Sequence, residues 1–139
     1  NGRSLHLCKR YPVIFDLLLR GFAPRWFKQR FQHRLSIYEM HELDNNQEPV
    51  SGIPIVSGCC MLTRTIALKA CGGFDNQYFM YFEDFDLSLR LHEKGEIVYL
   101  PAMHIVHYGG HAAKKGLKHV RMFSISALKF YRRHGWKFF

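Results

Sequence analysis

The sequence predicts an α/β protein in which helices alternate with short strands. Residues 53–62 form a compact apolar run with Gly58 inside it, which is typical of a buried strand. Residues 83–94 have the pattern of a helix and are followed by Gly95, a residue suited to a left-handed helix end. Residues 115–134 form a longer amphipathic pattern that predicts the last helix. With 139 residues, the chain is long enough for one small domain with a modest core.

The remaining elements are shorter. We expect helices over residues 11–20 and 63–71, and strands over residues 97–100 and 104–108. Residues 25–40 are basic and aromatic and indicate either a second helix or a mobile loop, whereas residues 41–49 are polar and acidic and indicate a connection. One apolar stripe on the last helix is expected to face the core, made of Phe123, Ala127, Phe130 and Tyr131.

Charge is distributed very unevenly along a chain whose formal net charge is +9. Residues 1–34 hold eight Lys and Arg against one acid, and residues 112–139 hold eight Lys and Arg and no acid. Residues 35–111 hold four Lys and Arg against ten acids. Two basic flanks therefore bracket an acidic centre. The flanks suit an anionic membrane surface, a lipid diphosphate or a nucleic acid, and the centre suits a metal ion or a neutral sugar.

Apolar content and cysteine usage limit the class of protein. At 47% apolar and 15% aromatic residues, the chain is not of the disordered type. No apolar run reaches the roughly 18 residues that a membrane-spanning helix needs, and no segment resembles a signal peptide. Four cysteines occur without a CxxC motif, and Cys59 and Cys60 would point to opposite faces of a strand. We therefore expect reduced thiols and a cytoplasmic location.

The most informative segment places three carboxylates within four positions. Glu83, Asp84 and Asp86 follow an aromatic run and fall in the first turn of a predicted helix, where the helix dipole favours anions. In one interpretation they are ordinary N-terminal charges, with an (i, i+4) pair between Asp86 and Arg90. In the other, they lie at the mouth of an aromatic pocket and act as a base or bind a cation.

Residues 72–90 read GGFDxxxFMYFEDxDLxLR, and a short strand, Pro101 and His107-Tyr108-Gly109-Gly110 follow. This string resembles the second half of a family-2 glycosyltransferase of the GT-A fold. More narrowly, it is similar to the bacterial rhamnosyltransferase and galactofuranosyltransferase type. The resemblance runs from about residue 56 to residue 136 and is weaker over the first 55 residues.

The resemblance implies the C-terminal portion of a GT-A fold, a mixed sheet flanked by helices. Residues 1–55 would form a basic helical or loop segment, and residues 56–139 the acceptor-side half that carries the catalytic base. The N-terminal nucleotide-binding half would be absent. Because the chain starts at Asn1 and the resemblance begins midway through the family's pattern, we expect a fragment that is inactive alone.

The activity implied is inverting transfer of a sugar such as rhamnose from a nucleotide-sugar donor. The acceptor would be a glycan or a polyprenyl-linked sugar, in the synthesis of a surface polysaccharide such as O-antigen. Asp84 matches the family's catalytic base, which takes the proton of the attacking acceptor hydroxyl. A divalent ion, Mn²⁺ or Mg²⁺, would be held mostly by the missing half. His107 matches a metal ligand of some members, and His104 and His111 flank it.

Further residues are candidates for contact with donor or acceptor. They are Glu83, Asp86, Arg90, Ser57, Gly58 and Phe82. Each has a structural alternative: an ion pair for Asp86 and Arg90, a tightly packed strand for Gly58, and core packing for the aromatic residues Phe79, Tyr81 and Phe82. Asp84-Phe85-Asp86 is literally a DxD motif, but a helix directs positions i and i+2 about 200° apart, which is poor for one ion.

Partners follow from the same charge pattern. Residues 114–137 predict either contact with an anionic membrane surface or a solvated helix, and an exposed apolar face would favour a homo-oligomer. Two other functions remain: a basic nucleic-acid-binding module and a non-catalytic scaffold in polysaccharide assembly. The acidic centre argues against the nucleic-acid module. The preferred location is the cytoplasm, peripherally at the inner face of the cell membrane.

Overall fold

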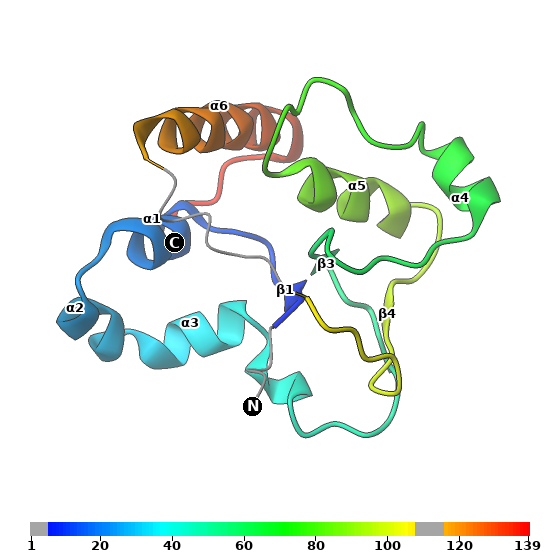
Figure 1. The fold of residues 1–139 in the computed structure, drawn as a ribbon, viewed down its shortest axis with the longest axis horizontal. Coiled ribbons are helices and arrows are strands. Elements are labelled where there is room, and N and C mark those ends of the chain that lie inside the picture. Colours follow the sequence, from blue (N-terminus) through cyan, green and yellow to red (C-terminus); the bar gives the residue numbers. More distant parts are fainter. Residues whose placement is uncertain (1–5, 108–115) are drawn as a thin grey trace.

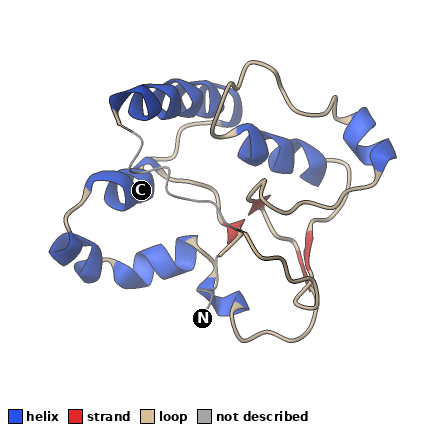
Figure 2. Cartoon of the chain, viewed as in Figure 1, coloured by secondary structure: helices blue, strands red, loops and turns tan. Residues whose placement is uncertain are grey.

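The computed structural model describes residues 6–107 and 116–139, which are mostly helical with two small sheets (Figures 1 and 2). The helices are α1 (Ile14–Phe22), α2 (Arg25–Arg30), α3 (Gln32–Tyr38), α4 (Thr65–Ala70), α5 (Glu83–His92) and α6 (Leu117–His134). A 3₁₀ turn, η1, spans His41–Leu43. The strands are β1 (Cys8–Lys9), β2 (Val50–Ser51), β3 (Ile55–Val56) and β4 (Val98–Tyr99).

The helices confirm most of the helix positions predicted from the apolar pattern of the sequence. α1, α4, α5 and α6 lie where helices are expected, and residues 25–40 form two helices rather than a mobile loop. α2 and α3 are separated at Phe31, whose backbone (φ −112°, ψ 21°) leaves the helical region. α5 ends at His92 and continues into a turn in which the amide of Gly95 donates to the carbonyl of Leu91 at 3.1 Å. The left-handed helix end expected at Gly95 was wrong, because its φ is not positive.

The strands differ from the expected mixed sheet. β1 pairs antiparallel with β3, and β2 pairs antiparallel with β4, so the described residues form two separate two-stranded ladders. The expected strand over residues 53–62 is reduced to β3, because the chain turns after Ser57. The Ser57 amide still donates to the Leu7 carbonyl at 2.8 Å, but the Gly58 amide donates to a side chain instead of continuing the ladder.

The strand predicted over residues 104–108 was also wrong within the part that is described. Residues 103–107 have no regular secondary structure and belong to neither ladder, and all five are exposed. Tyr108 lies outside the described residues. β4 confirms the strand expected over residues 97–100. The turn that contains Cys59 and Cys60 also removes the strand on which their opposite orientation was predicted.

The main core lies between α5, α6 and β3. Its buried members are Ile55, Tyr78, Phe82, Phe130 and Tyr131. The predicted stripe on α6 is confirmed, because Phe130 and Tyr131 are buried and the other two members pack against the same cluster. A second cluster, of Cys8, Met40, Leu43 and Ile53, packs against partly buried residues of both ladders, Val50, Val56 and Tyr99.

The C-terminal residues close the structure against α1 (Figure 1). The amide of Ile14 donates to the carbonyl of Lys137 at 2.9 Å, and the Tyr131 hydroxyl donates to the Pro12 carbonyl at 2.8 Å. The basic N-terminal helices and α6 are therefore joined into one packed unit.

All four cysteines have free thiols. Burial raises the pKa of the Cys8 thiol to about 11. Each helix within residues 6–107 and 116–139 is too short or too polar to cross a lipid bilayer.

The core assignment predicts a strong difference between two neighbouring positions of α6. Phe130→Ala should lower the free energy of unfolding by about 3–5 kcal/mol, because the ring is fully buried and its removal leaves a cavity. Leu128→Ala on the exposed side should cost less than about 1 kcal/mol. Urea titrations followed by circular dichroism would measure both, and equal losses would contradict the orientation of α6.

Candidate functional site

The candidate site lies at the start of α5, where the two residues before the helix have an unusual backbone conformation. Tyr81 and Phe82, which directly precede the helix, both have positive φ (69° and 63°), a conformation that non-glycine residues rarely adopt. Such strain persists only where the surroundings enforce it, and it concentrates at functional sites. Here the Phe82 ring is 4% exposed within the core, and the Ser126 hydroxyl on α6 donates to the Met80 carbonyl at 2.7 Å.

Tyr81 provides a further anchor for this entry. Its hydroxyl lies 2.8 Å from Nδ1 of His119, near the start of α6, and its ring packs edge-on against Phe123. Sequence analysis did not identify His119, since no local pattern connects two residues that lie 38 positions apart. The strained turn is therefore held by α6 at three places, and it fixes the direction in which the first turn of α5 points.

That direction brings Asp84 onto the end of β3. Its carboxylate accepts a hydrogen bond from the Gly58 amide at 2.8 Å (Oδ2) and another from the Phe85 amide at 2.9 Å (Oδ1). The second donor belongs to the first helical turn, whose amides have no partner inside the helix. Ser88, one turn later, adds a second connection: its hydroxyl donates to the Asp84 carbonyl at 2.7 Å and accepts from the Val56 amide at 3.1 Å.

Gly58 is required here for space. A Cβ at this position would lie 3.3 Å from Cβ of Asp84, which is tighter than ordinary contact, and 3.6 Å from its Oδ2. The structure therefore brings together two residues that the sequence singled out separately. Ser57 lies beside them on the same turn, and its amide is bonded to Leu7.

The electrostatics of Asp84 favour a base with a raised affinity for protons. Burial raises the pKa of its carboxyl above the ordinary value of 3.8, and the amides of Gly58 and Phe85 partly offset that shift. Burial also raises the pKa of the neighbouring Glu83, and the charge of Asp84 adds to this effect. Glu83 Oε2 is buried and has no hydrogen-bond partner among the described residues. Two adjacent carboxyl groups can thus accept a proton at this point.

Asp86 has a different environment, although it lies only two positions away. Its side chain is 0% exposed and accepts from Nε of Arg90 and from Nε2 of His134, each at 2.8 Å. The (i, i+4) ion pair offered as the structural alternative is therefore present, and His134 extends it to α6. Asp84 and Asp86 are directed to different neighbours, β3 and α6, so this DxD sequence does not form one ion-binding pair.

Phe82 and Asp86 are both enclosed by protein, so the structure gives them packing and ion-pairing roles rather than contact with a sugar. Phe79, by contrast, is 84% exposed and lies in the same turn. Of the aromatic platform considered from the sequence, Phe79 is thus accessible, whereas Phe82 is core.

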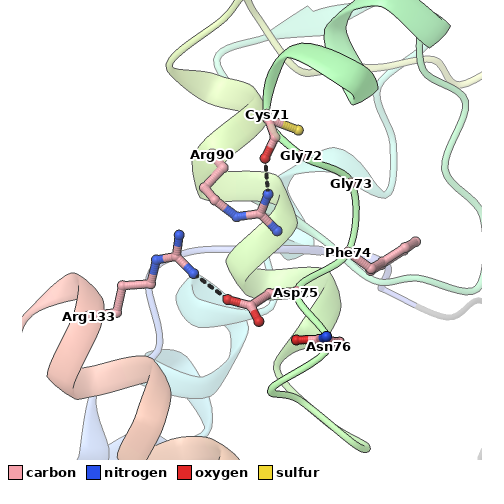
Figure 3. A pocket seen from close by; sticks show the side chains of 8 residues that line it. All are labelled: Cys71, Gly72, Gly73, Phe74, Asp75, Asn76, Arg90 and Arg133. Atoms are coloured by element: carbon pink, nitrogen blue, oxygen red, sulfur yellow. Dashed lines mark hydrogen bonds and ion pairs between the residues drawn. The ribbon is translucent and has the colours of Figure 1, made fainter.

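Arg90 also lines a separate hollow of about 350 Å³, together with Cys71, Gly72, Gly73, Phe74, Asp75, Asn76 and Arg133 (Figure 3). Nη1 of Arg90 donates to the Cys71 carbonyl at 2.5 Å, and Nη1 of Arg133 donates to Asp75 at 2.7 Å. The pKa of Asp75 is lowered, chiefly by the amide of Gln77 and also by Arg133. Both guanidinium groups already have carboxylate partners. Their role at this hollow is therefore to hold the Gly-Gly-Phe-Asp turn in place.

His107 is exposed at the end of the irregular segment 103–107, and His104 is exposed in the same segment. His111, like Gly109 and Gly110, lies outside the described residues. Within the described residues, the side chains close enough to share a metal ion are His6, His41 and Asp44. This group does not include His107, whose role as a ligand stays a prediction.

Comparison with known proteins addresses the resemblance directly. Two strains of Mycobacterium tuberculosis, CDC 1551/Oshkosh and ATCC 25618/H37Rv, have an N-acetylglucosaminyl-diphospho-decaprenol L-rhamnosyltransferase that is 40% identical to this chain over 76 residues. The match covers 54% of this chain and 24% of that enzyme. Rhamnosyltransferase WbbL of Escherichia coli K12 is 46% identical over 56 residues, which is 40% of this chain and 21% of that protein.

The chain is partly homologous to bacterial rhamnosyltransferases. This confirms the narrower resemblance drawn from the motif at residues 72–90. The match covers a quarter or less of the length of these relatives. No family model and no solved structure matches the chain.

The contact between Gly58 and Asp84 can be tested by adding one methyl group. Gly58→Ala should lower the free energy of unfolding by about 1–3 kcal/mol, because the Asp84 side chain must move away from the new Cβ. Gly95→Ala is a matched control, since nothing lies within 4 Å of a Cβ there. Urea titration of both variants measures the difference, and equal stabilities would contradict the close approach.

The raised pKa of Asp84 predicts a specific pH dependence. The folded protein retains this proton to a higher pH than the unfolded chain, whose pKa is near 3.8. Ionisation therefore costs stability as the pH rises from about 4 through the folded pKa. The free energy of unfolding of the wild type should fall across this window relative to that of Asp84→Asn, which lacks the titrating group. Urea titrations between about pH 3.5 and about pH 7, a range that begins near the ordinary carboxyl pKa, measure the difference. A wild type that gains stability relative to the variant across this range would contradict the predicted direction.

Proposed function

We propose that this chain is the acceptor-side segment of an inverting family-2 glycosyltransferase of the GT-A fold, and that it carries the catalytic base. The observation that carries the proposal is the carboxylate of Asp84, held by the amides of Gly58 and Phe85 in an environment that raises its pKa. Partial homology to rhamnosyltransferases supports the reaction class. Asp86, by contrast, forms an ion pair with Arg90.

In the proposed reaction, Asp84 takes the proton from an acceptor hydroxyl as its oxygen attacks the anomeric carbon of the donor sugar. The bond from that carbon to the nucleoside diphosphate breaks in the same displacement, which inverts the configuration. General-base assistance of this kind typically contributes about 10²- to 10⁴-fold. A raised pKa is suitable because it brings the base closer to the pH at which it must accept and release a proton.

The substrates proposed are those of the relatives. The names of the mycobacterial proteins describe transfer of L-rhamnose to a decaprenol carrying N-acetylglucosaminyl diphosphate. We take a nucleotide-linked rhamnose as the donor and a polyprenyl-diphosphate-linked sugar as the acceptor for the longer protein, in the synthesis of a surface polysaccharide. Glu83, next to the base and with an oxygen that has no described partner, is the residue proposed to accept from an acceptor hydroxyl.

A divalent cation, Mn²⁺ or Mg²⁺, would stabilise the departing diphosphate in such a reaction. His107 is exposed, and it belongs to no group of three potential ligands within residues 6–107 and 116–139. No step of the proposed mechanism is therefore assigned to the ion. Nucleotide binding is likewise attributed to residues beyond this segment, and the segment alone is expected to be inactive.

The decisive experiment compares wild type with Asp84→Asn in the longer protein that carries this segment. Release of nucleoside diphosphate from a panel of nucleotide sugars, with Mn²⁺ and a polyprenyl-linked acceptor, should fall by about 10²- to 10⁴-fold in the variant because the acceptor proton has no base. Glu96→Gln, an exposed acid after α5, is the matched control and should retain full turnover.

Circular dichroism would establish that Asp84→Asn is folded. Near wild-type turnover in a folded Asp84→Asn would remove Asp84 from the mechanism. No turnover by the wild type with any donor would favour the non-catalytic scaffold instead.

A further inference from the structure

α6 has a second apolar face, opposite the stripe that packs into the core. At 100° per residue, the outward side chains fall within roughly a quarter of the helix circumference. They are Leu117, Arg121, Ile125, Leu128 and Arg132. Phe130, on the other side, is fully buried, whereas Leu117, Ile125 and Leu128 are 87%, 44% and 40% exposed. A helix on the surface of a soluble domain needs only one apolar face, so this outer face requires a separate explanation.

The charges on the outer face are all of one sign. Residues 116–139 contain six Lys and Arg and no acid. Arg133 points inward and pairs with Asp75 and Asp86. Lys118, Arg121 and Arg132 form no ion pair with any residue of the described part of the chain. A solvated helix normally mixes opposite charges at (i, i+4) spacing, and this one does not.

The combination of aliphatic and uncompensated basic side chains identifies the kind of partner. A protein partner would have to place acidic groups opposite Lys118, Arg121 and Arg132, and charged residues are depleted at the centres of protein interfaces. A nucleic acid would match the charges but would leave Leu117, Ile125 and Leu128 without contacts, since single strands are bound by stacking on aromatic rings. An anionic bilayer satisfies both, because aliphatic groups enter the boundary of the acyl chains while Lys and Arg reach the phosphates.

We propose that the outer face of α6 is a docking surface for an anionic lipid bilayer, on which the helix lies parallel to the membrane plane. This docking surface comprises the outer face, Leu117, Arg121, Ile125, Leu128 and Arg132, together with Lys118, which borders it on the helix. The proposal differs from a simple insertion of the apolar stripe, since Phe123, Phe130 and Tyr131 are already used by the core. It goes beyond the proposed sugar transfer and does not depend on it.

The inner side of the same helix contacts the elements that position the candidate base. Ser126 bonds to Met80, His119 to Tyr81, and His134 to Asp86. A bilayer bound on the outer face would therefore hold α5 at a fixed distance from the lipid phosphates. This arrangement is well suited to an acceptor that is itself anchored in the membrane.

Vesicle flotation of the 139-residue chain tests the proposal without any sugar substrate. The chain should float with phosphatidylcholine vesicles that contain phosphatidylglycerol and remain in the dense fraction with phosphatidylcholine alone. Removing three outer cations should lower the partition coefficient at least about tenfold, because each contributes to attraction by the anionic surface. This variant is Lys118→Gln/Arg121→Gln/Arg132→Gln. Its matched control removes three exposed cations near α4 and α5, as Arg64→Gln/Lys69→Gln/Lys94→Gln, and should bind within about twofold of wild type.

The apolar part of the surface has its own pair of variants. Leu117→Ser/Leu128→Ser should weaken flotation several-fold, whereas Leu62→Ser/Ile66→Ser, which changes residues 84% and 78% exposed elsewhere, should not. If both charge variants lost vesicle binding equally, the binding would depend on the net charge of the protein alone, and the docking surface would be overturned. So would a wild type that fails to float, or one that single-stranded DNA displaces completely from the vesicles at physiological salt. Circular dichroism of every variant separates loss of binding from loss of folding.

Discussion

The hydrogen bond from the Gly58 amide to the Asp84 carboxylate is the interaction on which the arrangement of this segment depends. It ends the ladder of β3 by giving the next amide a side-chain acceptor, and it places the start of α5 against that ladder. Ser88 reinforces the junction from the second turn of the helix. Removing the carboxylate would take away the acceptor of the Gly58 amide, so it would affect the backbone as well as the chemistry. The proposed base is therefore also a structural residue, which is why its tests need a measurement of folding beside that of activity.

The strained backbone of Tyr81 and Phe82, just before α5, is stable because several contacts with α6 hold it in place. Two consecutive non-glycine residues with positive φ cost on the order of 1–2 kcal/mol each. Burial of the Phe82 ring, the Ser126 bond to Met80 and the contact between Tyr81 and His119 offset that cost. The buried carboxylate of Asp86 then fixes the rotation of α5 by binding His134. Once this rotation is set, Asp84 must face β3, since residues two apart on a helix point in different directions.

The sequence predicted the helices well because their apolar periodicity is local information. It predicted the strands poorly. The apolar run at residues 53–62 contained no sign that the Gly58 amide would bond to a carboxylate 26 positions away, and a run of this length does not distinguish a long strand from a strand followed by a turn. The (i, i+4) pair of Asp86 with Arg90 was visible in the spacing, whereas the contacts of His134 and His119 were not.

The assignment of Asp84 rested on the resemblance of a whole string, since three acids at a helix start are common in structural roles. Asp75 was quoted within that string, but its own turn, with the Gln77 amide on its carboxylate, was not recognised.

The distribution of charge inside the fold resolves an apparent conflict in the sequence. An acidic centre would repel a diphosphate-linked acceptor if its carboxylates were all ionised and exposed. In the structure, Asp86 is balanced by Arg90 and His134, and Asp75 by Arg133. Asp84 accepts hydrogen bonds from two amides, and burial raises the pKa of both Glu83 and Asp84. The outer face of α6 carries positive charges, Lys118, Arg121 and Arg132, that have no ion-pair partner among the described residues. The field outside the protein thus attracts anions, while the candidate site itself keeps only the carboxyl groups that proton transfer requires.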